Sequence, residues 1–234
     1  MKLFCIPYAG GCANIYWEWK NVFARDAEFI AIEYNGHGGR FCEELYKSVD
    51  EAVEDIVQRY FVSNTKPYVI YGHSLGSLIT LECVYRIREM GLKMPEYIIL
   101  AGTRPPHLLY KDPKYTQLPM SEFMDRIFDL GNTPREVLEN GELRELFYEI
   151  LLSDMKMVES YSHNDKLEKL DTPIMVCTGI EDKEAPQEDM CEWSIYTEGK
   201  CILKTFKGNH FFAFQDEVKE QVYESIKQVI RNLT

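Results

Sequence analysis

The chain has 234 residues, 45% of them hydrophobic, so it can form one sizeable core, and no segment approaches the roughly 20 apolar residues that span a bilayer. Its formal net charge of −12 at pH 7 argues against a nucleic-acid partner, because nucleic acids select basic surfaces. The seven cysteines show neither CxxC spacing nor a Cys/His cluster, which predicts reduced thiols, no metal site and a cytoplasmic location. We also expect no signal peptide and no membrane span.

Strand-like and helix-like segments alternate along the chain, which predicts a mostly parallel sheet with helices on both faces. The predicted strands cover residues 2–7, 29–34, 68–71, 97–101, 173–178 and 201–206. Helices are predicted over residues 50–60, 75–90 and 217–233. Ser48 and Glu51 form a capping box before the first of these helices, and Gly91 ends the second. We expect one domain over residues 1–234.

The segment Gly72-His73-Ser74-Leu75-Gly76 lies between a short apolar strand and a helix. G-x-S-x-G in this context predicts the nucleophile elbow of an α/β-hydrolase fold, although the short pattern also recurs by chance. The serine of an elbow occupies a strained turn, so the residues two positions away on each side must be small. Ser74 is therefore the candidate nucleophile, whereas His73 should point away from the site.

The alternation breaks between residues 101 and 173, about 70 residues without a strand pattern. Helices are predicted there over residues 122–130, 142–152 and 155–161, and Thr133-Pro134 is a further helix start. We interpret residues 113–162 as a helical lid, because this insertion follows the nucleophile and precedes the other candidate site residues. A long crossover connection that covers nothing is the alternative.

The remaining triad members are expected in the order acid, then histidine. The predicted strand 173–178 leads into Glu181-Asp182, and the strand 201–206 leads to His210. Both loops follow the carboxyl ends of strands, the edge of the sheet where Ser74 lies. Asp182 is preferred over Glu181, because a short carboxylate in a turn fixes an imidazole more rigidly, and a solvated loop is the alternative. Position and order favour His210 over three other histidines, His37, His107 and His163.

A tetrahedral oxyanion needs two converging hydrogen-bond donors. The first is expected to be the backbone N–H of Leu75, which follows the nucleophile. The second should come from the loop after the first strand, Pro7-Tyr8-Ala9-Gly10-Gly11, whose glycines allow close approach. Ala9 N–H is the candidate and Tyr8 the next choice. A tight turn without a catalytic role is the alternative.

Several motifs spread over nearly the whole chain resemble those of type II thioesterases, the stand-alone editing enzymes of nonribosomal peptide and polyketide synthases. They are residues 6–11 (IPYAGG), 34–40 (YNGHGGR), 72–76 (GHSLG), 101–107 (AGTRPPH), 130–138 (LGNTPREVL) and 153–154 (SD), followed by Gly-x-x-Asp182 and Gly-x-His210. One position departs from the family pattern, since Asn35 stands where a proline usually precedes the glycine.

The resemblance implies a triad of Ser74, Asp182 and His210, oxyanion donors at Ala9 and Leu75, and a lid over an acyl pocket. It further implies hydrolysis of acyl groups from the phosphopantetheine thiol of acyl or peptidyl carrier proteins. The substrate itself carries the phosphopantetheine, so no bound cofactor is expected.

We expect the carrier domain to bind in trans to a monomeric enzyme. Carrier domains are usually acidic, so the net charge of −12 predicts no long-range attraction, and docking requires a local basic or apolar patch. Nothing in a serine triad selects sulfur over oxygen. A small-molecule carboxylesterase or acyltransferase is therefore the alternative, and a catalytically silent ligand-binding or scaffolding protein is a third hypothesis.

Overall fold

The computed structural model describes residues 1–109, 114–131, 140–164 and 168–233. Within these residues, six parallel strands form one sheet in the order β2-β1-β3-β4-β5-β6. The strands are β1 (Lys2–Ile6), β2 (Glu28–Ala31), β3 (Tyr68–His73), β4 (Tyr97–Ala101), β5 (Ile174–Gly179) and β6 (Cys201–Phe206). The parallel sheet predicted from the alternating pattern is confirmed.

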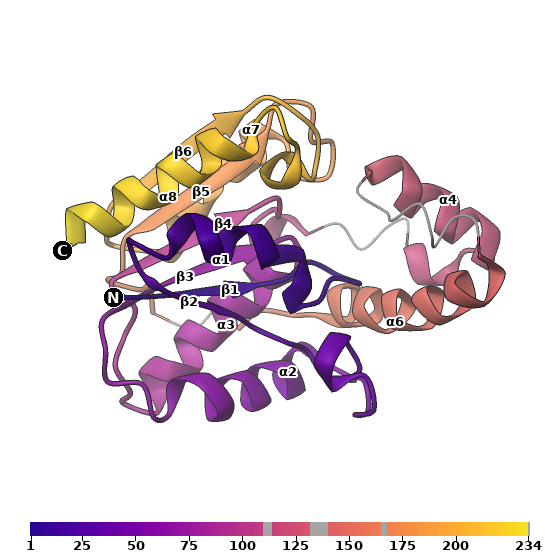
Figure 1. Cartoon of the computed structure of the whole chain (residues 1–234), viewed down its shortest axis with the longest axis horizontal. Helices are drawn as coiled ribbons and strands as arrows, with labels where there is room; N and C mark the ends of the chain where they lie inside the picture. Colours follow the sequence, from indigo (N-terminus) through magenta and orange to yellow (C-terminus); the bar gives the residue numbers. More distant parts are fainter. Residues whose placement is uncertain (110–113, 132–139, 165–167, 234) are drawn as a thin grey trace.

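Helices cover both faces of the sheet, as predicted (Figure 1). In β1, Leu3 and Cys5 point into a core shared with α1 (Trp17–Phe23) and α8 (Lys219–Leu233). Phe4 and Ile6 point into a core shared with α2 (Val49–Ile56) and α3 (Leu75–Glu89). This alternation follows from strand geometry, in which successive side chains lie on opposite faces. A further short helix, α7 (Gln187–Met190), follows β5.

Two of the predicted elements end three or four residues earlier than expected, and two short α-helices were not predicted. The strand predicted over residues 29–34 ends at Ala31, although Ile32 and Tyr34 are fully buried. The helix predicted over residues 50–60 ends at Ile56 and continues as a π-helical turn, Val57–Phe61. The helices α1 and α7 were not predicted, since they have only seven and four residues.

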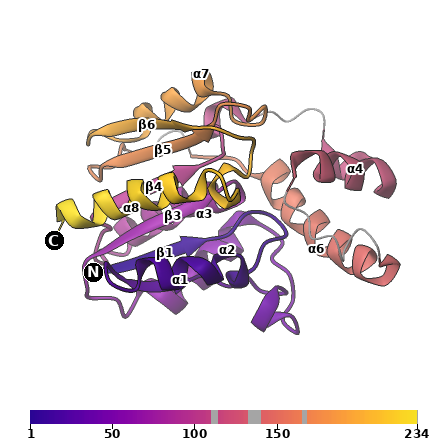
Figure 2. The same ribbon diagram turned by 45° about the horizontal axis from the view of Figure 1, so that its top comes forward.

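The segment between β4 and β5 contributes α4 (Met120–Leu130) and α6 (Gly141–Ser160). The predicted break near residues 153–154 was wrong, because α6 runs through it as one helix. Figures 1 and 2 show both helices beyond the carboxyl ends of the strands. The predicted helix start at Thr133-Pro134 lies outside the described residues.

The two helices share a small apolar cluster of their own, built from Phe123, Met124, Ile127 and Leu151. The lid function of the insertion stays a prediction. In the described part of the chain, no helix combines the length and hydrophobicity needed to cross a bilayer.

Candidate active site

Ser74 lies at the junction between β3, which ends at His73, and α3, which begins at Leu75. With φ of 53° and ψ of −120°, it is the one non-glycine residue with positive φ among those described. Backbone hydrogen bonds fix this turn: Ser74 N–H donates to Ala101 O, and Ser74 O accepts Ser77 N–H, each at 2.8 Å. The serine therefore stands on a sharp bend at the carboxyl edge of the sheet.

Two glycines make this bend possible. A Cβ on Gly72 would lie 2.2 Å from Gly76 O, and a Cβ on Gly76 would lie 2.3 Å from Ile6 O. Neither distance leaves room for a methyl group, so a larger residue would push α3 away from the sheet. The small residues that the motif predicts on both sides of Ser74 are thus explained by backbone packing.

Ser74, His210 and Asp182 form one chain of hydrogen bonds. Ser74 Oγ lies 3.0 Å from His210 Nε2, and His210 Nδ1 lies 3.1 Å from Asp182 Oδ2. When Nδ1–H donates to the carboxylate, Nε2 is left to accept the proton of the serine hydroxyl. The arrangement can therefore deprotonate Ser74 as it attacks a carbonyl carbon.

The carboxylate of Asp182 is fixed by backbone as well as by His210. Asp182 Oδ1 accepts the backbone N–H of Glu184 at 2.9 Å and of Ala185 at 3.2 Å. Burial by itself raises the pKa of Asp182, but the hydrogen bond and charge of His210 and the two backbone amides outweigh it, and the pKa is lowered. The group is thus ionised at neutral pH, whereas Glu181, the other candidate acid, is exposed.

His73 is fully buried and supports the main chain of His210. The Tyr71 hydroxyl donates to His73 Nδ1 at 3.0 Å, and His73 Nε2–H donates to His210 O at 2.9 Å. Burial, together with the nearby charge of His210, lowers the pKa of His73 to about 3. This ring is therefore neutral and engaged at both nitrogens, so it is not placed to act as the base.

The loop after β1 brings Ala9 into the same pocket as Ser74 and Leu75. Leu75 is the first residue of α3, so its N–H has no acceptor within the helix. The loop closes as a tight turn, with Gly11 N–H donating to Tyr8 O at 2.9 Å. The ring of Tyr8 packs instead against Phe211 and Phe214, so the structure places Ala9 rather than Tyr8 on the pocket.

A cavity of about 430 Å³ lies over Ser74 and His210. Part of its wall is apolar and is contributed by α3, α4, α6 and the loop after β4, through Leu78, Leu109, Leu130, Met155 and Val158. Charged side chains complete the lining, namely Arg104, Arg126, Glu159, Lys183 and Glu184. An apolar wall with a few polar groups is typical of a small-molecule site.

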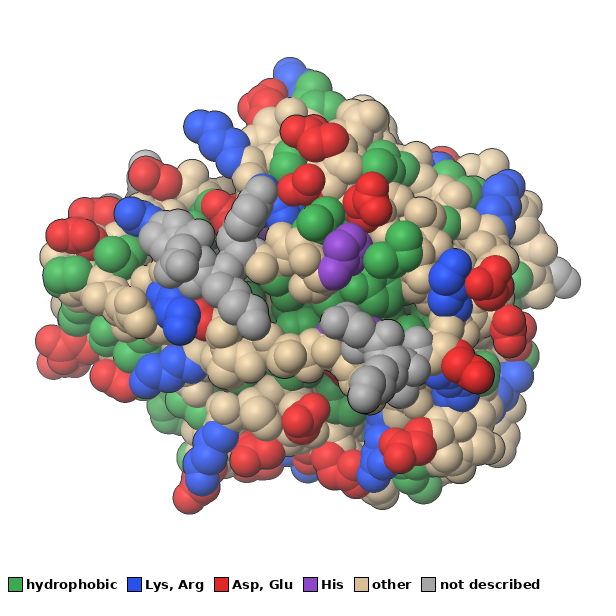
Figure 3. All heavy atoms as spheres, turned by 180° about the vertical axis from the view of Figure 1, so that it is seen from behind, with side chains coloured by type: hydrophobic (Ala, Val, Ile, Leu, Met, Phe, Trp, Pro, Cys, Tyr) green, Lys and Arg blue, Asp and Glu red, His purple; other side chains and the backbone are tan. Residues whose placement is uncertain are grey.

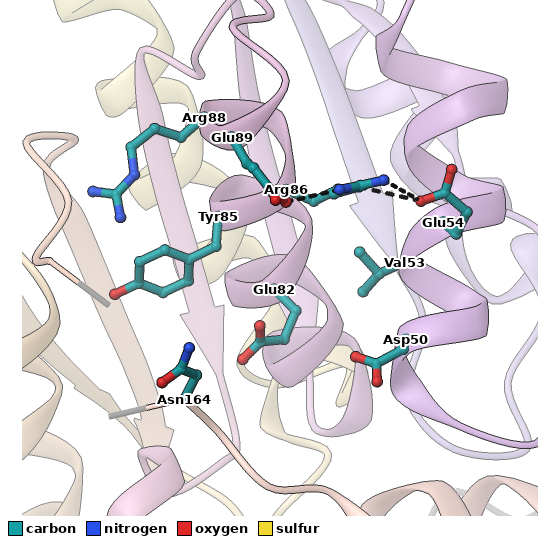
Figure 4. Close-up of a pocket in the computed structure, with 9 residues that line it drawn as sticks. All are labelled: Asp50, Val53, Glu54, Glu82, Tyr85, Arg86, Arg88, Glu89 and Asn164. Atoms are coloured by element: carbon teal, nitrogen blue, oxygen red, sulfur yellow. Dashed lines mark hydrogen bonds and ion pairs between the residues drawn. The ribbon is translucent and has the colours of Figure 1, made fainter. Parts of the chain in front are cut away.

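A second cavity, of about 600 Å³, lies between α2, α3 and Asn164 (Figure 4). The described residues that line it include no serine or cysteine. Three of its charged groups pair with one another: Arg86 lies 3.0 Å from Glu54 and 2.7 Å from Glu89, as the dashed lines in Figure 4 mark. We therefore place the candidate active site in the cavity that contains Ser74.

The three other histidines lie in separate contacts. His107 Nδ1 lies 3.1 Å from the Tyr196 hydroxyl, and His163 Nδ1 lies 2.7 Å from Glu82 Oε1. His37 contacts a carboxylate from the insertion, described below. Chain order thus singled out the histidine that the structure places beside Ser74.

Two side chains that support the site were not predicted from the sequence. Ser77 Oγ accepts Ala101 N–H at 3.0 Å and lies 2.9 Å from Gly72 O, which ties the elbow to β4. Asp154 Oδ2 accepts Gly10 N–H at 2.7 Å across 144 residues of sequence. In the sequence, Asp154 is marked only by the motif Ser153-Asp154 shared with type II thioesterases, and the motif by itself indicates no role for the carboxylate.

Comparison with known proteins decides the family. The family model of the thioesterase domain matches residues 1–230. The chain belongs to this thioesterase family. The enzyme is accordingly a hydrolase acting on thioester bonds, with the α/β-hydrolase fold that the sequence predicts.

Individual relatives are similar over most of their length. Gramicidin S biosynthesis protein GrsT of Aneurinibacillus migulanus is 27% identical over 233 residues, which cover 100% of this thioesterase and 89% of that protein. Thioesterase PikA5 of Streptomyces venezuelae is 30% identical over 218 residues, covering 91% and 75% of the two chains. The crystal structure of ClbQ from the colibactin NRPS/PKS pathway superimposes with a TM-score of 0.92 at 32% identity, covering 99% and 97%.

We expect His73→Ala to destabilise this thioesterase, because it leaves the Tyr71 hydroxyl and His210 O without their buried partner. The free energy of unfolding, measured by urea denaturation, should fall by about 2–4 kcal/mol. His107→Ala, at an exposed ring, is the matched control and should lower it by less than about 1 kcal/mol. Equal stability of the two variants would contradict the role given to His73.

Proposed function

We propose that this thioesterase hydrolyses acyl groups from the phosphopantetheine thiol of carrier proteins, as an editing enzyme of nonribosomal peptide or polyketide synthesis. The observation that carries the proposal is the Ser74–His210–Asp182 chain at a partly apolar pocket, in a member of the thioesterase family. Relatives named for such pathways, among them ClbQ, support it.

In the proposed reaction, Ser74 Oγ attacks the thioester carbonyl carbon while His210 Nε2 takes the hydroxyl proton. The amides of Leu75 and Ala9 donate to the oxyanion. The C–S bond then breaks, and His210 returns the proton to the leaving sulfur, which frees the carrier thiol. His210 next deprotonates a water that attacks the acyl-Ser74 ester, releasing the carboxylic acid and the free serine. Asp182 holds the Nδ1–H tautomer and stabilises the imidazolium in both halves.

The pocket wall supports an apolar acyl group as the part of the substrate bound deepest, along Leu78, Met155 and Val158. Arg126 and Lys183 line the same pocket and supply local positive charge, although the chain as a whole has a net charge of −12. Figure 3 shows acidic and basic side chains interspersed around exposed hydrophobic ones on one face of the molecule. Carrier docking is therefore proposed to depend on local contacts at the pocket mouth rather than on long-range attraction.

One chain supplies the nucleophile, the base, the acid and both amides, which supports action as a monomer and without a bound cofactor. The acidic composition argues against nucleic acid as a partner. Seven cysteines without a pairing pattern support the cytoplasm as the compartment.

Ser74→Ala tests the nucleophile. We expect kcat for an acyl-phosphopantetheinyl carrier protein to fall on the order of 10⁶-fold, because no other group can form the acyl-enzyme. Ser194→Ala removes an exposed hydroxyl elsewhere and should retain wild-type turnover. Substantial turnover by Ser74→Ala would refute the assignment of the nucleophile.

The substrate class is tested by comparing kcat/KM for a loaded carrier protein and for an acyl-nitrophenyl ester with the same acyl group. The proposal expects the carrier to be the better substrate, since it adds contacts outside the acyl pocket. An enzyme that cleaves the ester well and leaves the loaded carrier intact would instead be a carboxylesterase.

The pH dependence of kcat tests the base. The rate should decrease toward acid pH, because protonated His210 cannot accept the serine proton. His73 does not contribute to this change, since its pKa is about 3. A rate that does not decrease toward acid pH would argue against His210 as the base.

A further inference from the structure

A buried carboxylate connects the insertion to the loop after β1. Asp154, in the second half of α6, is 1% exposed. Its Oδ2 accepts Gly10 N–H at 2.7 Å and lies 3.0 Å from His37 Nε2. Gly10 directly follows Ala9, whose amide is the proposed second oxyanion donor. A residue of the insertion is thus one peptide unit away from the reaction site.

Apolar contacts press α6 against the same loop. A Cβ on Gly10, whose φ is 73°, would lie 3.1 Å from Leu151 Cδ1 and 3.2 Å from Phe147 Cε2. Ala9 packs against both the core on the α3 side and the apolar cluster of the insertion. The backbone of the loop at Ala9 and Gly10 is therefore confined from the insertion side as well as from the sheet side.

His37 holds the carboxylate of Asp154 in place. His37 Nδ1 lies 2.8 Å from Asn35 O, which can only accept, so Nδ1 carries a proton. His37 Nε2 lies 3.0 Å from Asp154 Oδ2, so both ring nitrogens face an oxygen, an arrangement that favours the protonated ring. Burial opposes this charge, but Asp154, the Asn35 carbonyl and Glu33 outweigh it and raise the pKa of His37.

We propose that Asp154 is a positioning residue of this thioesterase, which aims the Ala9 amide at the oxyanion through its bond to Gly10 N–H. The peptide that carries Gly10 N also carries the carbonyl carbon of Ala9, so fixing this amide restrains the backbone of Ala9. Without that anchor the Gly10 amide loses its only side-chain hydrogen bond among those described, and a glycine backbone resists rotation of the peptide less than any other residue. The inference rests on the proposed function, because it assumes the roles given there to Ser74 and Ala9.

The position of the Ala9 amide therefore depends on the position of the insertion. A shift of α6 relative to the sheet must move Gly10, and with it Ala9. Misplacing a reacting group by about 1 Å can cost on the order of 100-fold in rate. The position of α6 thereby bears on the rate of the chemical step as well as on access to the pocket.

The test compares Asp154→Ala with Ser153→Ala, using hydrolysis of an acyl-nitrophenyl ester. Ser153 is the matched control, because its hydroxyl also joins α6 to a loop but donates to Tyr46 O at 3.2 Å rather than bonding the loop after β1. We expect Asp154→Ala to lower kcat about 10- to 100-fold with little change in KM. Ser153→Ala should retain kcat, and Asp154→Asn, which keeps an acceptor oxygen for Gly10, should fall between the two.

A double variant separates positioning from stability. Asp154→Ala leaves His37 without its buried partner and should lower the melting temperature. Adding His37→Ala removes the unpaired group and should restore part of the melting temperature, while kcat stays low because Gly10 N–H still lacks its acceptor. Recovery of kcat together with stability would overturn the inference.

Two further outcomes are decisive. Wild-type kcat in Asp154→Ala, or an equal loss in Ser153→Ala, would also overturn it. Ser74→Ala, assayed alongside, distinguishes a failure of the proposed function from a failure of the positioning role. If that variant is active, the proposed function fails, whereas an inactive Ser74→Ala beside a fully active Asp154→Ala refutes the positioning role alone.

Discussion

Ser74 holds a backbone conformation that a side chain disfavours, with φ of 53°, and the geometry of the site depends on it. Such a turn costs on the order of 1–3 kcal/mol and persists only where its surroundings enforce it. Here β3 is buried along its whole length, and α3 approaches the end of β1 so closely that Gly76 admits no Cβ. The turn has no space in which to relax, so its hydroxyl stays within hydrogen-bonding distance of His210.

The parallel sheet turns three distant loops into neighbours of that hydroxyl. The loops after β1, β5 and β6 all leave the same edge, because the strands run in one direction. Buried hydrogen bonds then fix each loop: Tyr34 donates to Pro7 O at 2.7 Å, Thr178 donates to Ala185 O at 2.6 Å, and His73 donates to His210 O at 2.9 Å. The groups at the site are thus placed by the protein core, which favours a preorganised arrangement.

Strand patterns and chain order together pointed to Ser74, Asp182 and His210, which the structure brings together, because each follows a strand whose apolar run is visible in the sequence. The same patterns placed the end of β2 three residues too late, at Tyr34 instead of Ala31. Ile32 and Tyr34 are buried outside the sheet, and an apolar pattern indicates burial without distinguishing a strand from a loop. The patterns also placed a break at Ser153 and Asp154, two polar residues inside a helix. Their side chains bond Tyr46 O and Gly10 N–H instead, and these long-range contacts cannot be seen in the helix's own sequence.

In the proposed reaction, Ser74 attacks a carbonyl whose oxygen accepts hydrogen bonds from the Ala9 and Leu75 amides. A crystal structure with an alkyl boronic acid, which mimics the tetrahedral intermediate, tests this arrangement. We expect a covalent bond from boron to Ser74 Oγ, with one boron-bound oxygen about 2.7–3.1 Å from both amide nitrogens. An adduct absent from Ser74, or a boron-bound oxygen directed away from both amides, would contradict it.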